Sequence, residues 1–290
     1  MNILTFDTEE WYLERALYGG REFKYRQYDD TFSRLLDDLD RCNIKATFFC
    51  LGKLATERPD VIRMIADKGH EVGCHSDEHV WLTKMDEATL KKDTTEAIKA
   101  LEDASGQKVV SYRAPAFSIT PENKWALNVL AECGIENDSS IFPTARDFGG
   151  YLSFPQDTPC IVNNKGVTIK EYPISIATLL GKKMAYSGGG YFRILPYWIV
   201  KRKMNTKDYN ICYFHLNDLI SQKIKMKSKK EYEEYFNEPG TLKNRLVRYI
   251  KSNIGNSDAY GKFAKLICDY PFTSIRDFGF DWSKAETITL

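Results

Sequence analysis

The sequence lacks an excess of charge of either sign. Its 41 lysines and arginines face 40 aspartates and glutamates, which leaves a formal net charge of +1. A chain so balanced has no overall electrostatic attraction to nucleic acid, so we expect no nucleic-acid partner. Several lysines do gather in QKIKMKSKK, residues 222–230. We interpret this run as a solvated face, in preference to a docking patch for an anionic surface.

Paired cysteine motifs, long apolar runs and a secretory leader are also lacking. The seven cysteines are scattered, with no CxxC, which favours free thiols in a reducing compartment. No window approaches the ~18 apolar residues of a membrane span. The start, MNILTFDTEEW, has neither the basic region nor the apolar core of a signal peptide. We therefore expect a cytoplasmic protein without a transmembrane segment.

The sequence does contain a regular alternation of apolar strand patterns and helical periodicity. Strands are predicted at 2–6, 46–51, 70–74, 109–113 and 210–214, and helices at 29–42, 59–69, 86–106 and 120–134. This order predicts an α/β fold with a mainly parallel sheet, open or closed into a barrel, within one domain over 1–290. Residues 143–195, rich in proline and glycine, are expected to form loops and short hairpins over one end of the core.

Polar side chains follow five of the short apolar runs. Asp7, His75, Arg113 and His215 stand where a predicted strand ends, and Asp138 follows the short run 135–137. In parallel α/β sheets and barrels, ligands bind at the carboxyl ends of the strands. We therefore expect these five residues, distant in sequence, to converge on one site.

The chain has only four histidines, and two of them stand four residues apart in HSDEH. If residues 75–79 form a helical turn, His75 and His79 share one face and can bind one metal ion. The alternative is a surface turn with incidental histidines. An acid from FDTEEW is the natural third ligand, because alternation in an extended segment puts Asp7 and Glu9 on the same side. In the alternative reading, Glu9 and Glu10 belong to a solvated loop.

The motifs TFDTE, HSDEH, YRAP, NDSS and YFH, in this order, resemble those of the polysaccharide deacetylase family, the carbohydrate esterases with a NodB homology domain. They lie within residues 1–218. KEYPIS, SGGGYFRILPY and NEPGTLKNRL resemble the exosortase-associated bacterial subgroup. The resemblance implies a distorted (β/α) barrel of about seven strands, with 219–290 as a C-terminal helical extension packed on it.

The resemblance also implies residue roles. Asp7 matches the general base. The next position usually holds a metal-binding aspartate but is Thr8 here, and some relatives use an acid one residue further on, which matches Glu9. The implied metal ligands are then Glu9, His75 and His79, which suit zinc or another divalent ion. Arg113 matches the arginine that keeps the base anionic.

His215 matches the family's general acid, although Leu216 follows it where most relatives have proline. Asp138 either orients His215 or begins a turn. Pro115 and a backbone N–H near Ala116 are expected at the substrate, with the N–H holding the oxyanion. Aromatic side chains are candidate surfaces for sugar stacking: Tyr12, Trp81, Tyr191 and Phe192. SGGGY is interpreted as either a lid or a plain flexible loop.

The function implied is a metal-dependent hydrolase that removes an N-acetyl group from an amino sugar of a polysaccharide or its precursor. The partner is then a carbohydrate, and a peripheral contact with a membrane-linked precursor is conceivable. One alternative is a deacylase of the same fold that acts on a sugar N-formyl group or a ureide. A silent glycan-binding domain, suggested by Thr8, and a structural partner in a polysaccharide assembly complex are the others.

Overall fold

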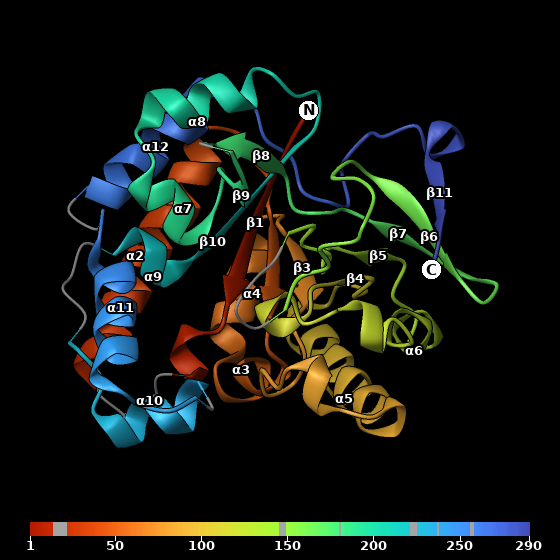
Figure 1. The fold of residues 1–290 in the computed structure, drawn as a ribbon, viewed down its shortest axis with the longest axis horizontal. Helices are drawn as coiled ribbons and strands as arrows, with labels where there is room; N and C mark the ends of the chain where they lie inside the picture. Colours follow the sequence, from red (N-terminus) through yellow and green to blue (C-terminus); the bar gives the residue numbers. More distant parts are fainter. Residues whose placement is uncertain (14–21, 145–148, 180, 221–224, 237, 256–257) are drawn as a thin grey trace.

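A nine-stranded sheet forms the centre of the protein in a computed structural model, which describes residues 1–13, 22–144, 149–179, 181–220, 225–236, 238–255 and 258–290 (Figure 1). The strand order is β10-β1-β2-β3-β4-β5-β7-β6-β11. The strands are β1 (Asn2–Thr8), β2 (Thr47–Cys50), β3 (Glu71–Cys74), β4 (Ser111–Tyr112), β5 (Asn137–Asp138), β6 (Cys160–Asn164), β7 (Val167–Glu171), β10 (Asn210–His215) and β11 (Glu286–Thr289). Every pairing from β10 to β7 is parallel, which makes seven consecutive parallel strands. This agrees with the expected number.

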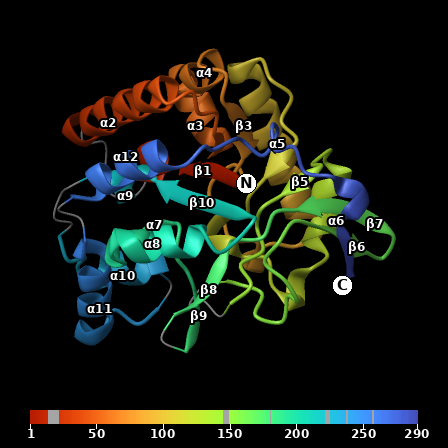
Figure 2. The ribbon, with the colours of Figure 1, turned by 90° about the horizontal axis from the view of Figure 1, so that it is seen from above.

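Helices surround the curved sheet (Figures 1 and 2). They are α2 (Glu22–Arg41), α3 (Gly52–Glu57), α4 (Pro59–Asp67), α5 (Glu87–Ser105), α6 (Ala126–Glu132), α7 (Gly189–Ile194), α8 (Tyr197–Met204), α9 (Leu216–Leu219), α10 (Lys229–Phe236), α11 (Leu242–Asn253) and α12 (Ala259–Asp269). Two of them, α10 and α11, lie at the periphery of the molecule. The predicted helix 120–134 is divided, with a 3₁₀ turn at Pro121–Asn123 before α6.

Strand alternation separates two apolar clusters. Leu4 and Phe6 of β1 belong to the large cluster that packs against the helices. Ile3 belongs to a second cluster on the inner face, with Ile211 and Tyr213 of β10. Because side chains alternate along a strand, Thr5 and Asp7 point to the same inner side as Ile3. The inner face thus carries apolar side chains at one end and polar side chains at the other.

Local signals fixed several element ends as expected. The Asp86 carboxylate accepts a hydrogen bond from the Thr89 N–H at 2.8 Å and caps α5, and Gly106 ends that helix with φ 68°. Other bounds differ. The helix predicted at 29–42 begins at Glu22, the strand predicted at 109–113 is reduced to Ser111–Tyr112, and α3 was not predicted.

Residues 143–195 contain the expected hairpins, β6–β7 and β8 (Ile176–Leu179) with β9 (Lys182–Ala185), and also helix α7. Residues 145–148 and 180 lie outside the described ranges. The extension over 219–290, expected to be helical, contains α10, α11 and α12 but also a strand, β11. After α12, the Ile275 N–H donates to Thr47 Oγ1 at 2.8 Å, and β11 pairs with β6. The sequence of β11, ETIT, has one apolar residue in four positions, which is too short a pattern to predict a strand.

All seven cysteines are free thiols, as predicted. In the part of the chain that the structure covers, no helix has the length and apolarity to cross a membrane.

Candidate metal and catalytic site

The site lies at the carboxyl ends of β1, β3 and β10. Asp7 and His215 are register partners in the parallel pair β1–β10, so two of the predicted residues meet through backbone pairing alone. His75 directly follows β3, and its N–H donates to the Cys50 carbonyl oxygen of β2 at 2.9 Å. Glu9 follows the end of β1 and is 8% exposed.

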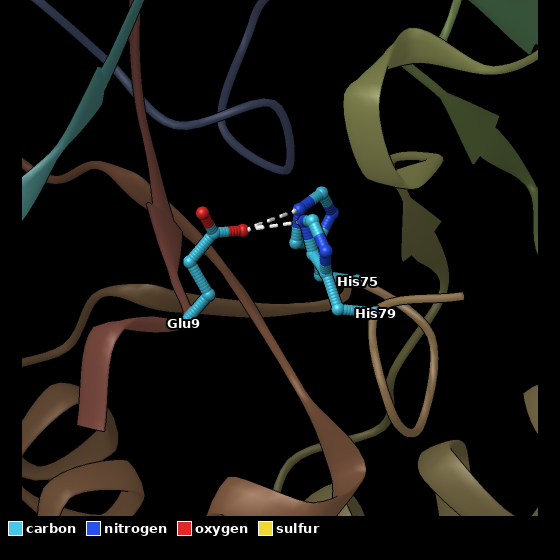
Figure 3. Close-up of side chains that lie close together, drawn as sticks. All are labelled: Glu9, His75 and His79. Atoms are coloured by element: carbon cyan, nitrogen blue, oxygen red, sulfur yellow. Dashed lines mark ion pairs between the residues drawn. The ribbon is translucent and has the colours of Figure 1, made fainter. Parts of the chain in front are cut away.

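Glu9, His75 and His79 form a compact cluster of ligand atoms (Figure 3). Glu9 Oε2 lies 2.7 Å from His79 Nε2 and 3.3 Å from His75 Nε2. All three atoms lie within 4.8 Å of one another. The Nδ1 of His75 is 2.7 Å from the Arg113 carbonyl oxygen, an acceptor, so Nδ1 carries the proton and Nε2 presents a lone pair to the cluster. Lone pairs this close together fit a shared divalent cation.

Residues 75–79 do not form the helical turn that was considered as one way to bring the two histidines together. Ser76 and His79 have φ values of 70° and 61°, in the left-handed region, so the segment is a loop. The Gly52 N–H donates to Ser76 O at 3.1 Å, and the His79 N–H donates to Ser76 Oγ at 2.9 Å. These bonds bend the loop so that both imidazoles reach Glu9. The spacing identified the right pair, but through a different backbone geometry.

Arg113 is fully buried and holds Asp7. Its Nη1 donates to Asp7 Oδ1 and to Thr5 Oγ1, each at 2.8 Å, and its guanidinium lies over the Phe49 ring at 4.3 Å. Burial raises the pKa of Asp7, but the positive charge of Arg113, with smaller contributions from the neighbouring His75 and His215, outweighs burial, so the pKa lies below its usual value. Asp7 is therefore anionic and able to accept a proton.

His215 faces both carboxylates. Its Nε2 lies 3.7 Å from Asp7 Oδ2 and 3.6 Å from Glu9 Oε1. On its other side, Nδ1 is 3.2 Å from Asp218 Oδ2. Burial lowers the pKa of His215, but the charges of Glu9, Asp218 and Asp7 outweigh burial and raise it to about 10. The imidazole is thus charged in the metal-free protein and carries a proton that it can donate.

Asp138 is not the carboxylate beside His215, a place that Asp218 takes. Asp138 accepts hydrogen bonds from Ser140 N at 3.1 Å and Ser140 Oγ at 2.6 Å, the geometry of a local turn. Ser140 Oγ in turn accepts from the Ala114 N–H at 2.8 Å. Of the two uses considered for Asp138, the structure favours the turn, which fixes the chain just after Arg113.

Glu9 and Glu10 are both buried, so the solvated-loop interpretation of this segment is wrong. Glu10 Oε1 accepts from the Asn217 N–H at 2.8 Å. Burial and the neighbouring charge of Glu9 raise the pKa of Glu10 to about 7. Thr8 is also buried, and its side chain contacts Cys50 on the neighbouring strand. It lies on the opposite side of β1 from Asp7 and outside the ligand cluster, which supports Glu9 as the carboxylate of that cluster.

Some of the residues predicted to contact substrate are accessible to solvent, and others are buried. Pro115 is buried, and Ala116 is partly exposed with φ 55° in the turn that follows Arg113. Trp81 and Tyr191 are partly exposed, as is Tyr12. Phe192 is 1% exposed and packs edge-on against Phe214, so it is a core residue and not a sugar-stacking surface.

SGGGY is neither a lid nor a plain loop. Gly188 forms a β-bridge with Tyr213, and Gly189 begins α7. A Cβ on Gly188 would lie 2.4 Å from Tyr213 O, so the glycine permits close approach of two backbones inside the protein.

Sequence reasoning missed the residues that orient the predicted ones. Thr5 and Ser139 fix the Arg113 guanidinium, whose Nη2 donates to Ser139 Oγ at 2.9 Å. Asp218 holds His215, and Arg193 Nε lies 3.3 Å from Asp218 Oδ1. Alternation from Asp7 could have indicated Thr5, and an acid three residues after His215 could have indicated Asp218.

A model of the polysaccharide deacetylase family matches residues 3–137. A second model, described as a domain of unknown function (DUF3473), matches residues 139–278. Together they confirm the resemblance, including that to the exosortase-associated subgroup. Strands of both segments share the nine-stranded sheet, and the extent of the domain over 1–290 stays a prediction.

Curated polysaccharide deacetylases match shorter stretches of the chain. A peptidoglycan-N-acetylglucosamine deacetylase from Listeria monocytogenes is 36% identical over 88 residues, which cover 30% of this chain and 19% of the relative. One from Bacillus cereus is 33% identical over 94 residues, 32% and 34% of the two chains. A chitooligosaccharide deacetylase from Bradyrhizobium sp. is 30% identical over 125 residues, 40% and 55% of the two chains. The matched stretches thus span from a fifth to about half of these relatives.

A crystal structure from Mycobacterium smegmatis, of a protein named after the polysaccharide deacetylases, covers 94% of this chain and 92% of its own. The TM-score is 0.55 at 22% sequence identity. This likeness confirms the fold, a NodB-like barrel with a mostly parallel sheet.

Proposed function

We propose that the protein is a metal-dependent hydrolase that removes an N-acetyl group from an amino sugar of a polysaccharide or its precursor. The observation that carries the proposal is the meeting of two groups of residues at one strand edge. One group is the ligand cluster of Glu9, His75 and His79. The other is the Asp7–Arg113 pair with His215 beside it. The names of the relatives support the N-acetyl amino sugar as substrate.

The ligand cluster fits a divalent transition ion such as zinc. Glu9 Oε2 is buried and accepts no well-aligned hydrogen bond from the described residues, although the Nε2 atoms of His75 and His79 lie beside it. Two imidazoles and a carboxylate are the donor set of a hydrolytic metal site. When bound, the ion would supply a Lewis acid for the acyl oxygen and for water.

The chain's own residues would carry the protons. Asp7, kept anionic by Arg113, would accept a proton from the attacking water at its Oδ2, the oxygen that faces His215. His215, held by Asp218, would donate its Nε2 proton to the departing amine. A backbone N–H in the turn at Pro115 and Ala116 would stabilise the negative charge that develops on the acyl oxygen.

The direct test is acetate release from N-acetylglucosamine oligomers. We expect release by the wild-type enzyme and a loss of about 10²-fold or more in Asp7→Asn, which keeps the shape of the site but removes the base. Formate release from N-formyl sugars in place of acetate would shift the proposal to the alternative acyl group. Glycan binding without any release would overturn the hydrolase and leave the silent binding domain.

A matched control separates chemistry from folding. Asp103 on α5 lies far along the chain from the site and is exposed, so Asp103→Asn makes the same change in charge and is expected to leave release unchanged. Full activity of Asp7→Asn, with Asp103→Asn also active, would remove Asp7 from the role of base.

A cytoplasmic location stays a prediction.

A further inference from the structure

Helix α11 presents an uncovered apolar stripe. None of its residues is buried. Leu242, Leu246, Ile250 and Ile254 follow one another at intervals of four, which places them in one row, and Val247 lies beside the row. Their exposed fractions run from 43% to 64%. A helix that packs on a protein core buries such a stripe, so this one is available to a partner.

The stripe continues onto α7, and α8 follows α7 directly along the chain. Arg193 Nη1 donates to the Ser252 carbonyl oxygen at 2.9 Å, and a Cβ on Gly255 would lie 2.3 Å from Arg193 O. The end of α11 therefore touches the end of α7, where Ile194 is 50% exposed, and Trp198 on α8 is 65% exposed. Figures 1 and 2 both show α11, α7 and α8 along the same side of the molecule. We call this surface the apolar patch: Leu242, Leu246, Val247, Ile250, Ile254, Ile194 and Trp198.

Basic side chains lie beside the apolar patch, two of them in ion pairs, Arg248 with Glu238 and Lys201 with Asp269. The sequence of α11, LKNRLVRYIKSN, contains four basic residues and no acidic residue. Arg245 Nη1 donates to the Lys227 carbonyl oxygen at 3.3 Å, which places the lysine-rich segment 225–230 beside α11. The last turn of α8 adds Lys201, Arg202 and Lys203. The described part of the run interpreted as a solvated face, residues 225–230, thus borders an exposed apolar surface.

The exposed apolar side chains and the basic side chains beside them together indicate what binds the patch. A second copy of the chain would oppose one basic α11 to another and bring like charges together. An apolar helix face with a tryptophan and a basic border is the pattern of helices that lie in the headgroup region of a bilayer. Anionic lipids would attract the lysines and arginines while the aliphatic side chains enter the acyl boundary. We propose that the apolar patch docks the protein on a bilayer surface that contains anionic lipids.

The patch adjoins the catalytic end of the barrel. Arg193, which precedes Ile194, lies with Nε 3.3 Å from Asp218 Oδ1, and Asp218 holds the His215 imidazole. Docking would therefore place the site beside the membrane surface, where a saccharide carried by a lipid would reach it. Docking goes beyond the proposed function and does not depend on hydrolysis, so the two can fail separately.

The test is cosedimentation with vesicles. Full-length protein is mixed with vesicles of phosphatidylcholine alone or of phosphatidylcholine and phosphatidylglycerol in equal parts. We expect binding to the anionic vesicles, weaker binding as salt is raised, and a loss of about tenfold or more in Leu246→Ser/Ile250→Ser, because each buried methylene contributes to partitioning. Lys243→Glu/Lys251→Glu should also lose binding to the anionic vesicles.

Matched controls lie elsewhere on the surface. Leu152 is 63% exposed outside the patch, so Leu152→Ser should bind as the wild type does, and Lys92→Glu on α5 should do the same. Wild-type protein that stays in solution with anionic vesicles would overturn the proposal, as would equal binding by the serine variant. A dimer in analytical ultracentrifugation that Leu246→Ser/Ile250→Ser dissociates would also overturn it, because a second copy would then cover the patch.

Discussion

At the scale of single residues, the decisive feature is a buried ion pair whose two members have different tasks. Asp7 is 2% exposed and Arg113 is fully buried, so neither charge is solvated. Each is stabilised by the other, and the Arg113 guanidinium also donates to the neutral acceptors Thr5 and Ser139. The pair thus makes folding depend on the same charges that keep Asp7 anionic, as its proposed role in proton transfer requires.

Removing the guanidinium should therefore cost stability as well as activity. We expect Arg113→Met to lower the free energy of unfolding by about 3 kcal/mol, because Asp7 remains buried without its cation. Urea denaturation measures the change. The double variant Asp7→Asn/Arg113→Met should recover part of the loss, since it leaves no unpaired charge. If the double variant is less stable than Arg113→Met, the ion pair is not the cause.

His70 provides a residue-scale prediction that is remote from the site. Its Nδ1 accepts the Ala46 N–H at 3.2 Å, and burial lowers its pKa to about 4. A lowered histidine pKa means that the unfolded chain binds the proton more readily, so this contribution is complete above pH 6.5 and is lost as the pH falls toward 4. We expect it to reach about 3 kcal/mol.

Thermal unfolding at pH 7 and pH 5 checks this, with His70→Asn as the comparison because its carboxamide oxygen can replace Nδ1 as acceptor. The wild type should lose more stability than the variant between the two pH values. An equal loss in both proteins would show that His70 does not titrate with the lowered pKa.

At the scale of elements, close backbone contacts position the catalytic strand. Gly188 lies against Tyr213, two residues before His215, and a Cβ there would be 2.4 Å from Tyr213 O. Gly188→Ala should destabilise the protein by about 1–3 kcal/mol and reduce turnover, because β10 must shift. Gly190 offers a control in the same glycine run, since its Cβ would meet only the end of the Arg193 side chain at 3.5 Å. Gly190→Ala measured beside it should change stability little; an equal effect of the two would contradict this account.

Element prediction from sequence succeeded where the pattern was long and capped. The periodicity of α5, with Asp86 and Gly106 at its ends, allowed nearly exact bounds. Prediction failed at β4, because only two residues form the strand and backbone pairing, not a side-chain pattern, defines it. It also failed at α3, whose six residues are too few to show a helical period. The loop of HSDEH depends on a bond from Gly52 to Ser76, and a contact between such distant segments is not encoded in local spacing.

At the scale of the whole molecule, the segment between α12 and β11 closes the barrel at the end where β2 and β3 begin. Ile275 and Phe278 belong to the inner apolar cluster, and the Arg276 N–H donates to buried Glu71 at 2.8 Å. The sequence predicted the site, whose motifs stand at strand ends, better than this closure, which rests on single apolar residues in an irregular segment.

This closure leads to a paired prediction. Ile275→Ala should lower the free energy of unfolding by about 2–5 kcal/mol, because it leaves a cavity in a 2%-exposed position. Ile250→Ala removes the same atoms from a 49%-exposed position and should change it by no more than about 0.5 kcal/mol. Denaturant titration of both variants distinguishes them. Equal effects would mean that the segment around Ile275 does not close the barrel.

The central claim is that the side chain of Glu9, and not that of Thr8, completes a metal site with His75 and His79. The most direct measurement is anomalous diffraction at the edges of zinc and other divalent transition metals from crystals of protein purified without chelator. The account predicts one peak bound by Glu9 Oε2 and the Nε2 atoms of both histidines, and its loss in Glu9→Gln. A peak bound elsewhere in the protein, or full occupancy in Glu9→Gln, would contradict it.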